Sequence, residues 1–212
     1  MMTYLVWIMT FSEEESHQRI LNFGESTAVL AGNSLLTMAF EILSHKNLNI
    51  SEKNKNNLIN KISESSGHLG IAGGQYLDLH YEHKKVSQKK IIEMEIKKTG
   101  KLFSFCCVAP LILKNKSQKD IKKFENIGAD IGLLFQVADD LIDHKGNFRI
   151  VGKKTGKDKK KGKATLVSLM GYKNTIKYAN NLIIKINNKV KKYGSKSQNL
   201  SKTLNYILTR NK

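Results

Sequence analysis

The sequence predicts an all-α protein with one domain, and three features support this fold class. The 212 residues include a single proline, Pro110, and proline is the residue that most strongly breaks helices. Apolar residues recur at three- and four-residue spacing, and no segment of any length alternates with the two-residue period of a strand. A hydrophobic content of 40% over this length suffices for one sizeable core.

The first half of the chain is expected to form two helices and a glycine-rich segment. Residues 26–44 have a strong helical pattern with small residues that permit close packing, and a polar loop at about 45–54 follows. The next helix carries Leu58, Ile59 and Ile62 and leads into GHLGIAGGQYLDL. Four glycines in so short a run are costly inside helices, so they indicate a place where backbones or a ligand come close.

Four further helices are expected, at residues 88–113, 118–144, 164–192 and 198–209. The first of them is expected to bend near Thr99 and Gly100 and to end near Pro110, because glycine and proline weaken helices. A loop rich in glycine and lysine, residues 146–163, is expected after the second. The chain shows no internal repeat.

The formal net charge of +18 comes almost entirely from lysine. A strongly basic chain raises nucleic acid as a partner. Arginine, the preferred reader of bases and phosphates, nevertheless occurs only at Arg19, Arg149 and Arg210. Lysine, asparagine and isoleucine share codons rich in A and T, so the base composition of the gene explains the charge more simply. Nucleic acid is therefore not expected as a partner.

Cys106 and Cys107 are adjacent in an apolar segment, where neighbouring cysteines rarely bridge each other, and they lack metal-ligand spacing. We expect both to be reduced core residues of a cytoplasmic protein. No apolar run is expected to reach the roughly 18–20 residues that cross a bilayer. The stretch YLVWIM near the start is short and lacks a cleavage site, so a signal peptide is not expected either.

The strongest chemical signal is the segment FQVADDLID, residues 135–143. Its three aspartates, Asp139, Asp140 and Asp143, stand on an otherwise apolar helix, where the first and third share one face. Gln136 lies one turn before Asp140. Carboxylates this close repel one another unless a cation neutralises them, and Mg²⁺ takes carboxylate, water and phosphate oxygens. A magnesium site is one interpretation, and a solvent-facing acidic turn is the other.

Three weaker signals accompany the aspartates. The segment VGKKTGKDKKKGKAT, residues 151–165, is a flexible cationic loop that can fold over an anion, although a solvated charge run has the same composition. KKTG, residues 97–100, offers an ammonium and a hydroxyl to a phosphate at a helix interruption. GGQYLD, residues 73–78, is weak alone. Together they suit the ionisation of a diphosphate ester, in which Mg²⁺ and cations stabilise the leaving group.

The order of these motifs, from GESTAVLAGNSLLTMAFEIL to VGKKTGKDKKKGKAT, resembles the bacterial farnesyl diphosphate synthases between Phe23 and about Gly171. The resemblance implies that residues 23–212 are the C-terminal two-thirds of an isoprenoid synthase helical bundle, which is usually a homodimer. It implies a prenyltransferase that condenses an allylic diphosphate, dimethylallyl or geranyl, with isopentenyl diphosphate to give farnesyl diphosphate. It also implies Mg²⁺ as the cofactor.

The resemblance assigns roles to particular positions. It places Mg²⁺ on Asp139, Asp140 and Asp143. It places the allylic diphosphate on Lys98, Thr99, Gln136, Lys153 and Lys163, and gives Lys98 and Thr99 the stabilisation of the developing cation. Asp158 lies between the two loop lysines, and Gln75 and Asp78 match cavity-facing positions.

Residues 1–22 match nothing in that family and are expected to be an out-of-frame or non-native leader. The family carries a first aspartate-rich motif and a basic patch for isopentenyl diphosphate in the preceding region. Read from the last base of Met1, the codons of residues 1–20 force four aspartates at the spacing of that motif, which predicts a frameshift near Ile20. The chain as written is then expected to be inactive.

Two alternatives stay open at this point. One is a non-catalytic remnant or partner subunit of a prenyl diphosphate synthase. The other is a geranylgeranyl diphosphate synthase, because the residues that set product length in this family precede the matched segment. The motif spacing inferred from the shifted frame favours the C15 product over C20.

Overall fold

The computed structural model describes residues 24–151 and 162–210, and within these ranges it contains helices and no strand. The all-α prediction is therefore confirmed for the described part of the chain. The elements are α3 (Glu25–Ser44), α4 (Glu52–Ser66), α5 (Ile71–Tyr81), α6 (Gln88–Glu95), the π-helical turn η1 (Ile96–Gly100), α7 (Lys101–Leu113), α8 (Gln118–Val151), α9 (Leu166–Met170), α10 (Tyr172–Val190), the 3₁₀ segment η3 (Lys191–Ser197) and α11 (Gln198–Thr209). Residues 1–22, the expected leader, lie outside the described residues.

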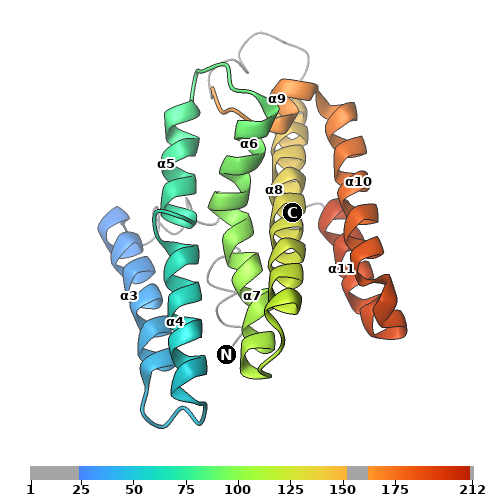
Figure 1. Cartoon of the computed structure of the whole chain (residues 1–212). Helices are drawn as coiled ribbons and strands as arrows, with labels where there is room; N and C mark the ends of the chain where they lie inside the picture. Colours follow the sequence, from blue (N-terminus) through green and yellow to red (C-terminus); the bar gives the residue numbers. More distant parts are fainter. Residues whose placement is uncertain (1–23, 152–161, 211–212) are drawn as a thin grey trace.

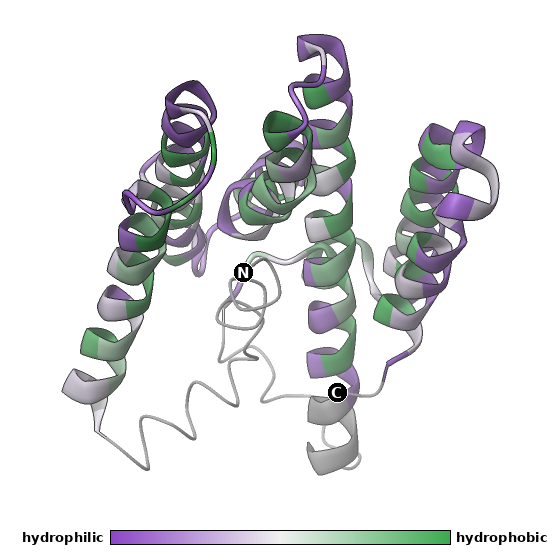
Figure 2. Cartoon of the chain, turned by 90° about the horizontal axis from the view of Figure 1, so that it is seen from below, coloured by the Kyte–Doolittle hydropathy of each residue, from purple (hydrophilic) through white to green (hydrophobic). Residues whose placement is uncertain are grey.

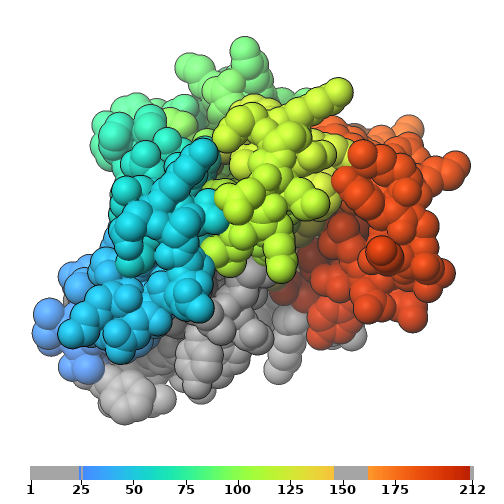
Figure 3. All heavy atoms as spheres, turned by 60° about the horizontal axis from the view of Figure 1, so that its bottom comes forward, coloured from blue at the N-terminus to red at the C-terminus, as the bar shows by residue number. Residues whose placement is uncertain are grey.

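The helices lie side by side in a bundle around the long helix α8 (Figure 1). The continuous run of α6, η1 and α7 packs along α8, and α10 and α11 pack on another side of it. Helix α4 packs against α7, and α5 packs against η1. Helix α3 contacts α4 at the margin of the bundle. The space-filling view shows α3 and α4 on one flank and the C-terminal helices on the other (Figure 3).

Local sequence explains where several helices begin. Ser51 caps α4 because its hydroxyl oxygen accepts a hydrogen bond from the N–H of Asn54, at 3.3 Å. Thr165 caps α9 through a reciprocal pair with Ser168, in which each backbone N–H donates to the other residue's hydroxyl oxygen. Gly171 separates α9 from α10 with a φ of +80°, a value that side chains rarely allow. The single helix predicted over 164–192 is therefore wrong.

One other predicted helix end differs from the structure. Helix α8 continues to Val151, beyond the end expected at residue 144 and into the expected loop. One interior glycine, Gly146, costs a helix only about 1 kcal/mol and does not by itself end it. Pro110 lies inside α7, and the helix ends three residues later at Leu113, the last residue of the predicted range 88–113.

The core is divided into two clusters of buried side chains. The larger cluster joins α8 to α9, α10 and α11 and includes Ile127, Leu134, Leu166, Ile186 and Leu204. The smaller cluster joins α3, α4 and α7 and includes Leu43, Leu58, Ile62, Phe105 and Val108. Figure 2 shows apolar and polar residues interleaved along the ribbons of these helices, as in helices that bury one face. Each fully buried leucine or isoleucine contributes about 1.5–3 kcal/mol.

A buried ion-pair cluster adds to the contact between α8 and α10. Asp130 of α8 is 6% exposed, and its two carboxylate oxygens accept hydrogen bonds from Lys185 at 2.7 Å and Lys189 at 2.6 Å. The two lysines lie one turn apart on α10, so one carboxylate fixes the register of the two helices. Because both oxygens are satisfied, the buried charge is compensated.

Cys106 and Cys107 are free, as predicted, but they are half-buried and pack against the two core clusters instead of lying inside them. Burial raises the pKa of Cys106 to about 11 and, with the neighbouring thiol as a smaller cause, that of Cys107 to about 12. Both thiols are therefore protonated and unreactive at neutral pH.

Helix α3 departs from the expectation that no apolar segment could span a membrane. Residues Ser26–Ser44 form one helix that is long and apolar enough to do so by length and composition. Its polar residues are mostly small and uncharged, which keeps the mean hydropathy high. Much of its apolar surface is open, with Val29 57%, Leu30 64% and Met38 49% exposed.

Candidate active site

The π-helical turn η1 lies at the centre of the candidate site, between α5 and α8. At its end the N–H of Lys101 donates to the carbonyl of Ile96, which widens the helix by one residue. A Cβ added at Gly74 of α5 would lie 2.1 Å from the backbone nitrogen of Lys98. A Cβ added at Gly132 of α8 would lie 2.5 Å from the Cα of Gly100. Glycine at both positions thus permits backbone contact, as the glycine-rich sequence predicted for α5.

The two close approaches bring polar side chains together one turn further along each helix. Asp78 follows Gly74 on α5, and its carboxylate accepts a hydrogen bond of 2.6 Å from the ammonium of Lys98. Gln136 follows Gly132 on α8, and its amide oxygen accepts a 3.0 Å hydrogen bond from the hydroxyl of Thr99. The bend predicted near Thr99 is therefore present, and it directs consecutive residues of η1 toward opposite neighbours.

The network continues into the acidic motif of α8. The amide nitrogen of Gln136 donates to Asp140 Oδ1 at 3.3 Å, so Thr99, Gln136 and Asp140 form one connected chain. The other oxygen of Asp140 is buried without a hydrogen-bond partner. Asp143 is exposed, one turn beyond Asp139. The acidic turn is therefore partly solvent-facing and partly buried, so a wholly solvated turn does not describe it, and the magnesium site stays a prediction.

Glu95, at the end of α6, is a site residue that sequence reasoning missed. Its side chain is 3% exposed, and one carboxyl oxygen is buried without a partner. Burial, and then the nearby charge of Asp140, raise the pKa of Glu95 well above its ordinary value, while Lys98 and Lys163 oppose the shift. A glutamate one turn before Lys98 was the available signal, although glutamate is common on exposed helix faces.

Asp140 has a similar environment. Burial raises the pKa of Asp140 to about 7, and the charges of Asp139 and Asp143 contribute, against the hydrogen bond from Gln136. Repulsion among these carboxylates is what the sequence predicted from their spacing. A cation bound beside Asp140 would stabilise its ionised form.

The second residue that sequence reasoning missed is Arg210. It follows the last residue of α11, and its guanidinium forms an ion pair with Asp139 Oδ1. The guanidinium also lies 4.1 Å from the ring centroid of Phe135, one turn before Asp139 on α8. No motif in the sequence links residues so far apart.

The aspartates fit Mg²⁺ in donor chemistry and do not form a closed metal cage. Within residues 24–151 and 162–210, no group of three or more His, Cys, Asp or Glu side chains is arranged to hold a metal ion. The unpartnered buried oxygen of Asp140 is nevertheless a suitable ligand. Mg²⁺ commonly binds through one or two carboxylates and completes its shell with water and substrate phosphates.

The remaining predicted residues are placed less closely. Lys163 is half-buried, directly after Gly162, whose carbonyl accepts a 2.8 Å hydrogen bond from the N–H of His83. Its charge acts on Glu95, as that of Lys98 does. Gln75 is exposed on α5. Lys153 and Asp158 lie outside the described residues.

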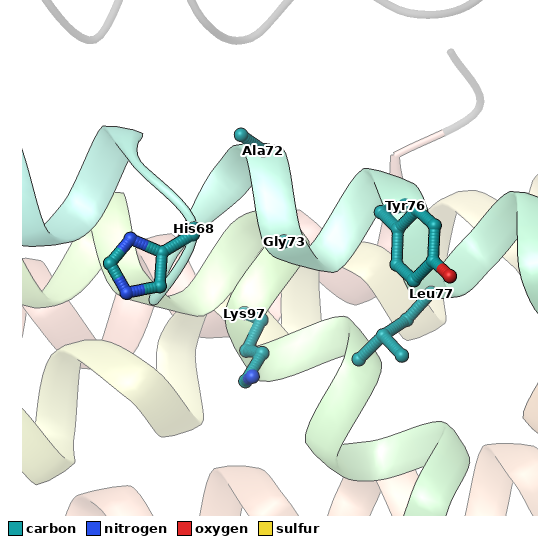
Figure 4. Close-up of a pocket in the computed structure, with 6 residues that line it drawn as sticks. All are labelled: His68, Ala72, Gly73, Tyr76, Leu77 and Lys97. Carbon is teal, nitrogen blue, oxygen red and sulfur yellow. The ribbon is translucent and has the colours of Figure 1, made fainter.

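A pocket of about 340 Å³ lies beside this network (Figure 4). It is lined by His68, Ala72, Gly73, Tyr76, Leu77 and Lys97. None of these is among the predicted site residues. Lys97 lines the pocket, while the next residue, Lys98, donates a hydrogen bond to Asp78. The two lysines of the KKTG motif therefore contact different groups.

Comparisons with known proteins agree with this geometry. Residues 13–206 match the polyprenyl synthetase family model. The chain is 36% identical to farnesyl diphosphate synthase of Micrococcus luteus over 197 residues, which cover 93% of this chain and 66% of that protein. It is 31% identical to geranylgeranyl diphosphate synthase of Cyanophora paradoxa, over 89% of this chain and 63% of that protein. The chain thus spans less than two thirds of the length of these two relatives.

A solved structure shares the arrangement of helices. Geranyltransferase of Helicobacter pylori, complexed with magnesium and isoprenyl diphosphate, superposes with a TM-score of 0.73 at 30% sequence identity. The match covers 89% of this chain and 61% of that one. The fold expected from the sequence, an isoprenoid synthase bundle, is therefore confirmed.

Proposed function

Because this chain belongs to the polyprenyl synthetase family, we propose that it carries the allylic diphosphate site of a prenyl diphosphate synthase. The observation that carries the proposal is the connected set on η1 and α8. Lys98 and Thr99 project from one helix bend, and Thr99 is joined through Gln136 to Asp140. An ammonium, a hydroxyl and carboxylates are the groups that a metal-bound diphosphate requires, and the charge of Lys98 acts on Asp140, which supports the proposal.

The proposed reaction joins an allylic diphosphate to isopentenyl diphosphate. The bond between the allylic carbon and the diphosphate oxygen breaks, and its electron pair leaves with the diphosphate. The double bond of isopentenyl diphosphate then supplies the electrons of the new carbon–carbon bond, and a proton is lost to restore neutrality.

The chain's own residues support the first step. The Lys98 ammonium donates to diphosphate oxygens and is held in place by Asp78. The Thr99 hydroxyl and the Gln136 amide are oriented by each other and lie beside the developing cation. Lys163 adds positive charge to the site. For Lys153, Asp158 and Gln75 the proposal rests on the family resemblance alone.

The residues that would hold magnesium are Asp139, Asp140 and Asp143. Bound there, Mg²⁺ supplies the positive charge that stabilises the departing diphosphate. The Helicobacter pylori relative, whose structure contains magnesium and isoprenyl diphosphate, supports this proposal.

The product proposed is farnesyl diphosphate, with geranylgeranyl diphosphate as the second candidate. The Micrococcus luteus relative is a farnesyl diphosphate synthase, and the Cyanophora paradoxa relative is a geranylgeranyl diphosphate synthase at slightly lower identity. A cytoplasmic homodimer is part of the same proposal. The exposed apolar side chains of α3 would be covered by a second copy.

We also propose that residues 1–20 are read out of frame. The forced aspartates of the shifted frame support this. The family match begins at residue 13, upstream of Ile20, which counts against a boundary at Ile20 itself. Sequencing of the gene across the first codons tests the proposal directly, and an unbroken frame there would remove it.

The experiment for the function is incorporation of radiolabelled isopentenyl diphosphate with geranyl diphosphate and Mg²⁺. It compares this chain, a version with the upstream frame restored, and each with Asp140→Asn. Activity of the restored protein, lowered at least about 100-fold by Asp140→Asn, is expected, which corresponds to about 2.7 kcal/mol of barrier. Mass analysis of the product distinguishes C15 from C20. Inactivity of every version would refute the proposed activity.

A further inference from the structure

Arg210 holds one of the carboxylates that the proposed magnesium site needs. The guanidinium is paired with Asp139 Oδ1 and stacked on the ring of Phe135, both on α8. The Arg210 side chain is 14% exposed and that of Asp139 is 33% exposed, so the arginine is the more shielded member of the pair. Helix α11 packs against α8 and α10, and this packing delivers Arg210 to the acidic turn (Figure 1).

The pairing neutralises Asp139 without any metal. A guanidinium on a carboxylate oxygen occupies the space and the lone pair that a metal ion would use, because both are cations that approach along the same directions. The Nε atom of Arg210 is buried without a hydrogen-bond partner. Its position is therefore determined by charge and by the aromatic ring more than by a complete set of hydrogen bonds.

We propose that Arg210 is a displaceable stand-in for the metal ion at Asp139. It neutralises the acidic turn while metal is absent and leaves Asp139 when metal binds. Displacement requires motion of a single side chain after the last turn of α11, so the bundle itself can stay unchanged. The apparent affinity for metal is then lowered by the free energy of the Arg210–Asp139 pair. This inference rests on the proposed function, because it needs a metal at the aspartates.

Titration with Mn²⁺ alone, followed by the electron paramagnetic resonance signal of the free ion, tests the proposal. The variants are Arg210→Gln, Asp139→Asn and Lys202→Gln. Lys202 is an exposed lysine of α11, so its substitution removes the same charge from the same helix without touching the aspartates. Arg210→Gln is expected to bind Mn²⁺ about 5- to 10-fold more tightly than the unaltered chain, a range that corresponds to about 1–1.4 kcal/mol. Lys202→Gln is expected to change the affinity less than twofold.

A second measurement separates displacement from a merely structural role. In EDTA, Arg210→Gln is expected to lower the melting temperature, because the ion pair between Arg210 and Asp139 is lost. With saturating Mn²⁺ the difference from the unaltered chain is expected to disappear, which a residue needed only for packing would not produce. If Arg210→Gln and the unaltered chain bind Mn²⁺ with equal affinity while Asp139→Asn binds it more weakly, the role of Arg210 is overturned and the metal site remains. Absence of Mn²⁺ binding in every variant would overturn both.

Discussion

The buried carboxyl groups of Glu95 and Asp140 determine the electrostatics of the site at the scale of single residues. Each has one oxygen without a hydrogen-bond partner, and burial raises the pKa of both. When folding raises the pKa of a carboxyl group, the group is protonated in the folded chain and ionised in the unfolded chain at pH values between the two pKa values. Its contribution to stability is therefore unfavourable above its ordinary pKa and vanishes below it.

Glu95→Gln is expected to raise stability at pH 8 and to leave it nearly unchanged at pH 4. The amide keeps the shape of the protonated acid and cannot ionise, so the variant lacks the penalty that grows as pH rises above about 4.5. A relief of about 1–2 kcal/mol would raise the melting temperature by roughly 2–8 °C for a chain of this size. Calorimetry at both pH values measures it, with the exposed Glu93→Gln as control. Equal shifts at pH 4 and pH 8 would contradict the assignment.

Asp140 gives a second prediction, for the metal rather than for the fold. A carboxyl with a pKa of about 7 must lose its proton to act as a ligand. The apparent affinity for Mg²⁺ is therefore expected to fall as pH drops below 7, approaching tenfold per unit. Calorimetric titration between pH 5.5 and 8.5 measures this dependence. Asp140→Asn should bind Mg²⁺ weakly at every pH, and a pH-independent affinity of the unaltered chain would be inconsistent with Asp140 as a ligand.

At the scale of elements, the position of η1 between α5 and α8 depends on two glycines. Gly74 and Gly132 let neighbouring backbones touch η1, and the residues one turn further, Asp78 and Gln136, then reach Lys98 and Thr99. The polar network therefore forms only when the helices are as close together as the two glycines allow. A side chain at either glycine would separate the helices and the hydrogen-bond partners together.

Gly74→Ala is expected to destabilise the chain by about 1–3 kcal/mol, because the added methyl would meet the rigid backbone of Lys98. Gly32→Ala is the matched control, since its methyl would meet nothing within 4 Å on an exposed helix. It is expected to stabilise by up to about 1 kcal/mol through higher helix propensity. Urea unfolding of both variants measures the difference, and similar effects of the two substitutions would rule out the backbone contact between α5 and η1.

At the scale of the whole molecule, the exposed apolar face of α3 departs from a closed bundle. Val29, Leu30, Met38 and Ile42 are exposed there, on the flank opposite the C-terminal helices (Figure 3). Exposed apolar surface of this kind marks a contact with another segment or another molecule. A second copy of the chain is the partner that the family resemblance implies.

Leu30→Lys is expected to weaken dimerisation at least tenfold, because a charge would be buried in an apolar contact. Sedimentation velocity over a concentration series measures the dissociation constant. Asn205→Lys adds the same charge to an exposed position of α11, on the other flank, and should leave the dimer intact. A monomer at all concentrations of the unaltered chain would exclude the dimer.

The sequence by itself determined the helical class, the bend at Thr99, the glycine contact at Gly74 and the acidic turn of α8. These features are local, because helix period, glycine and adjacent carboxylates act over one or two turns of chain. The tertiary structure alone decided that Glu95 is buried beside Asp140, that Lys98 reaches Asp78, and that Arg210 lies on Asp139, 71 residues away. Such pairings depend on which helix faces meet when the bundle packs, and local propensity carries no information about them.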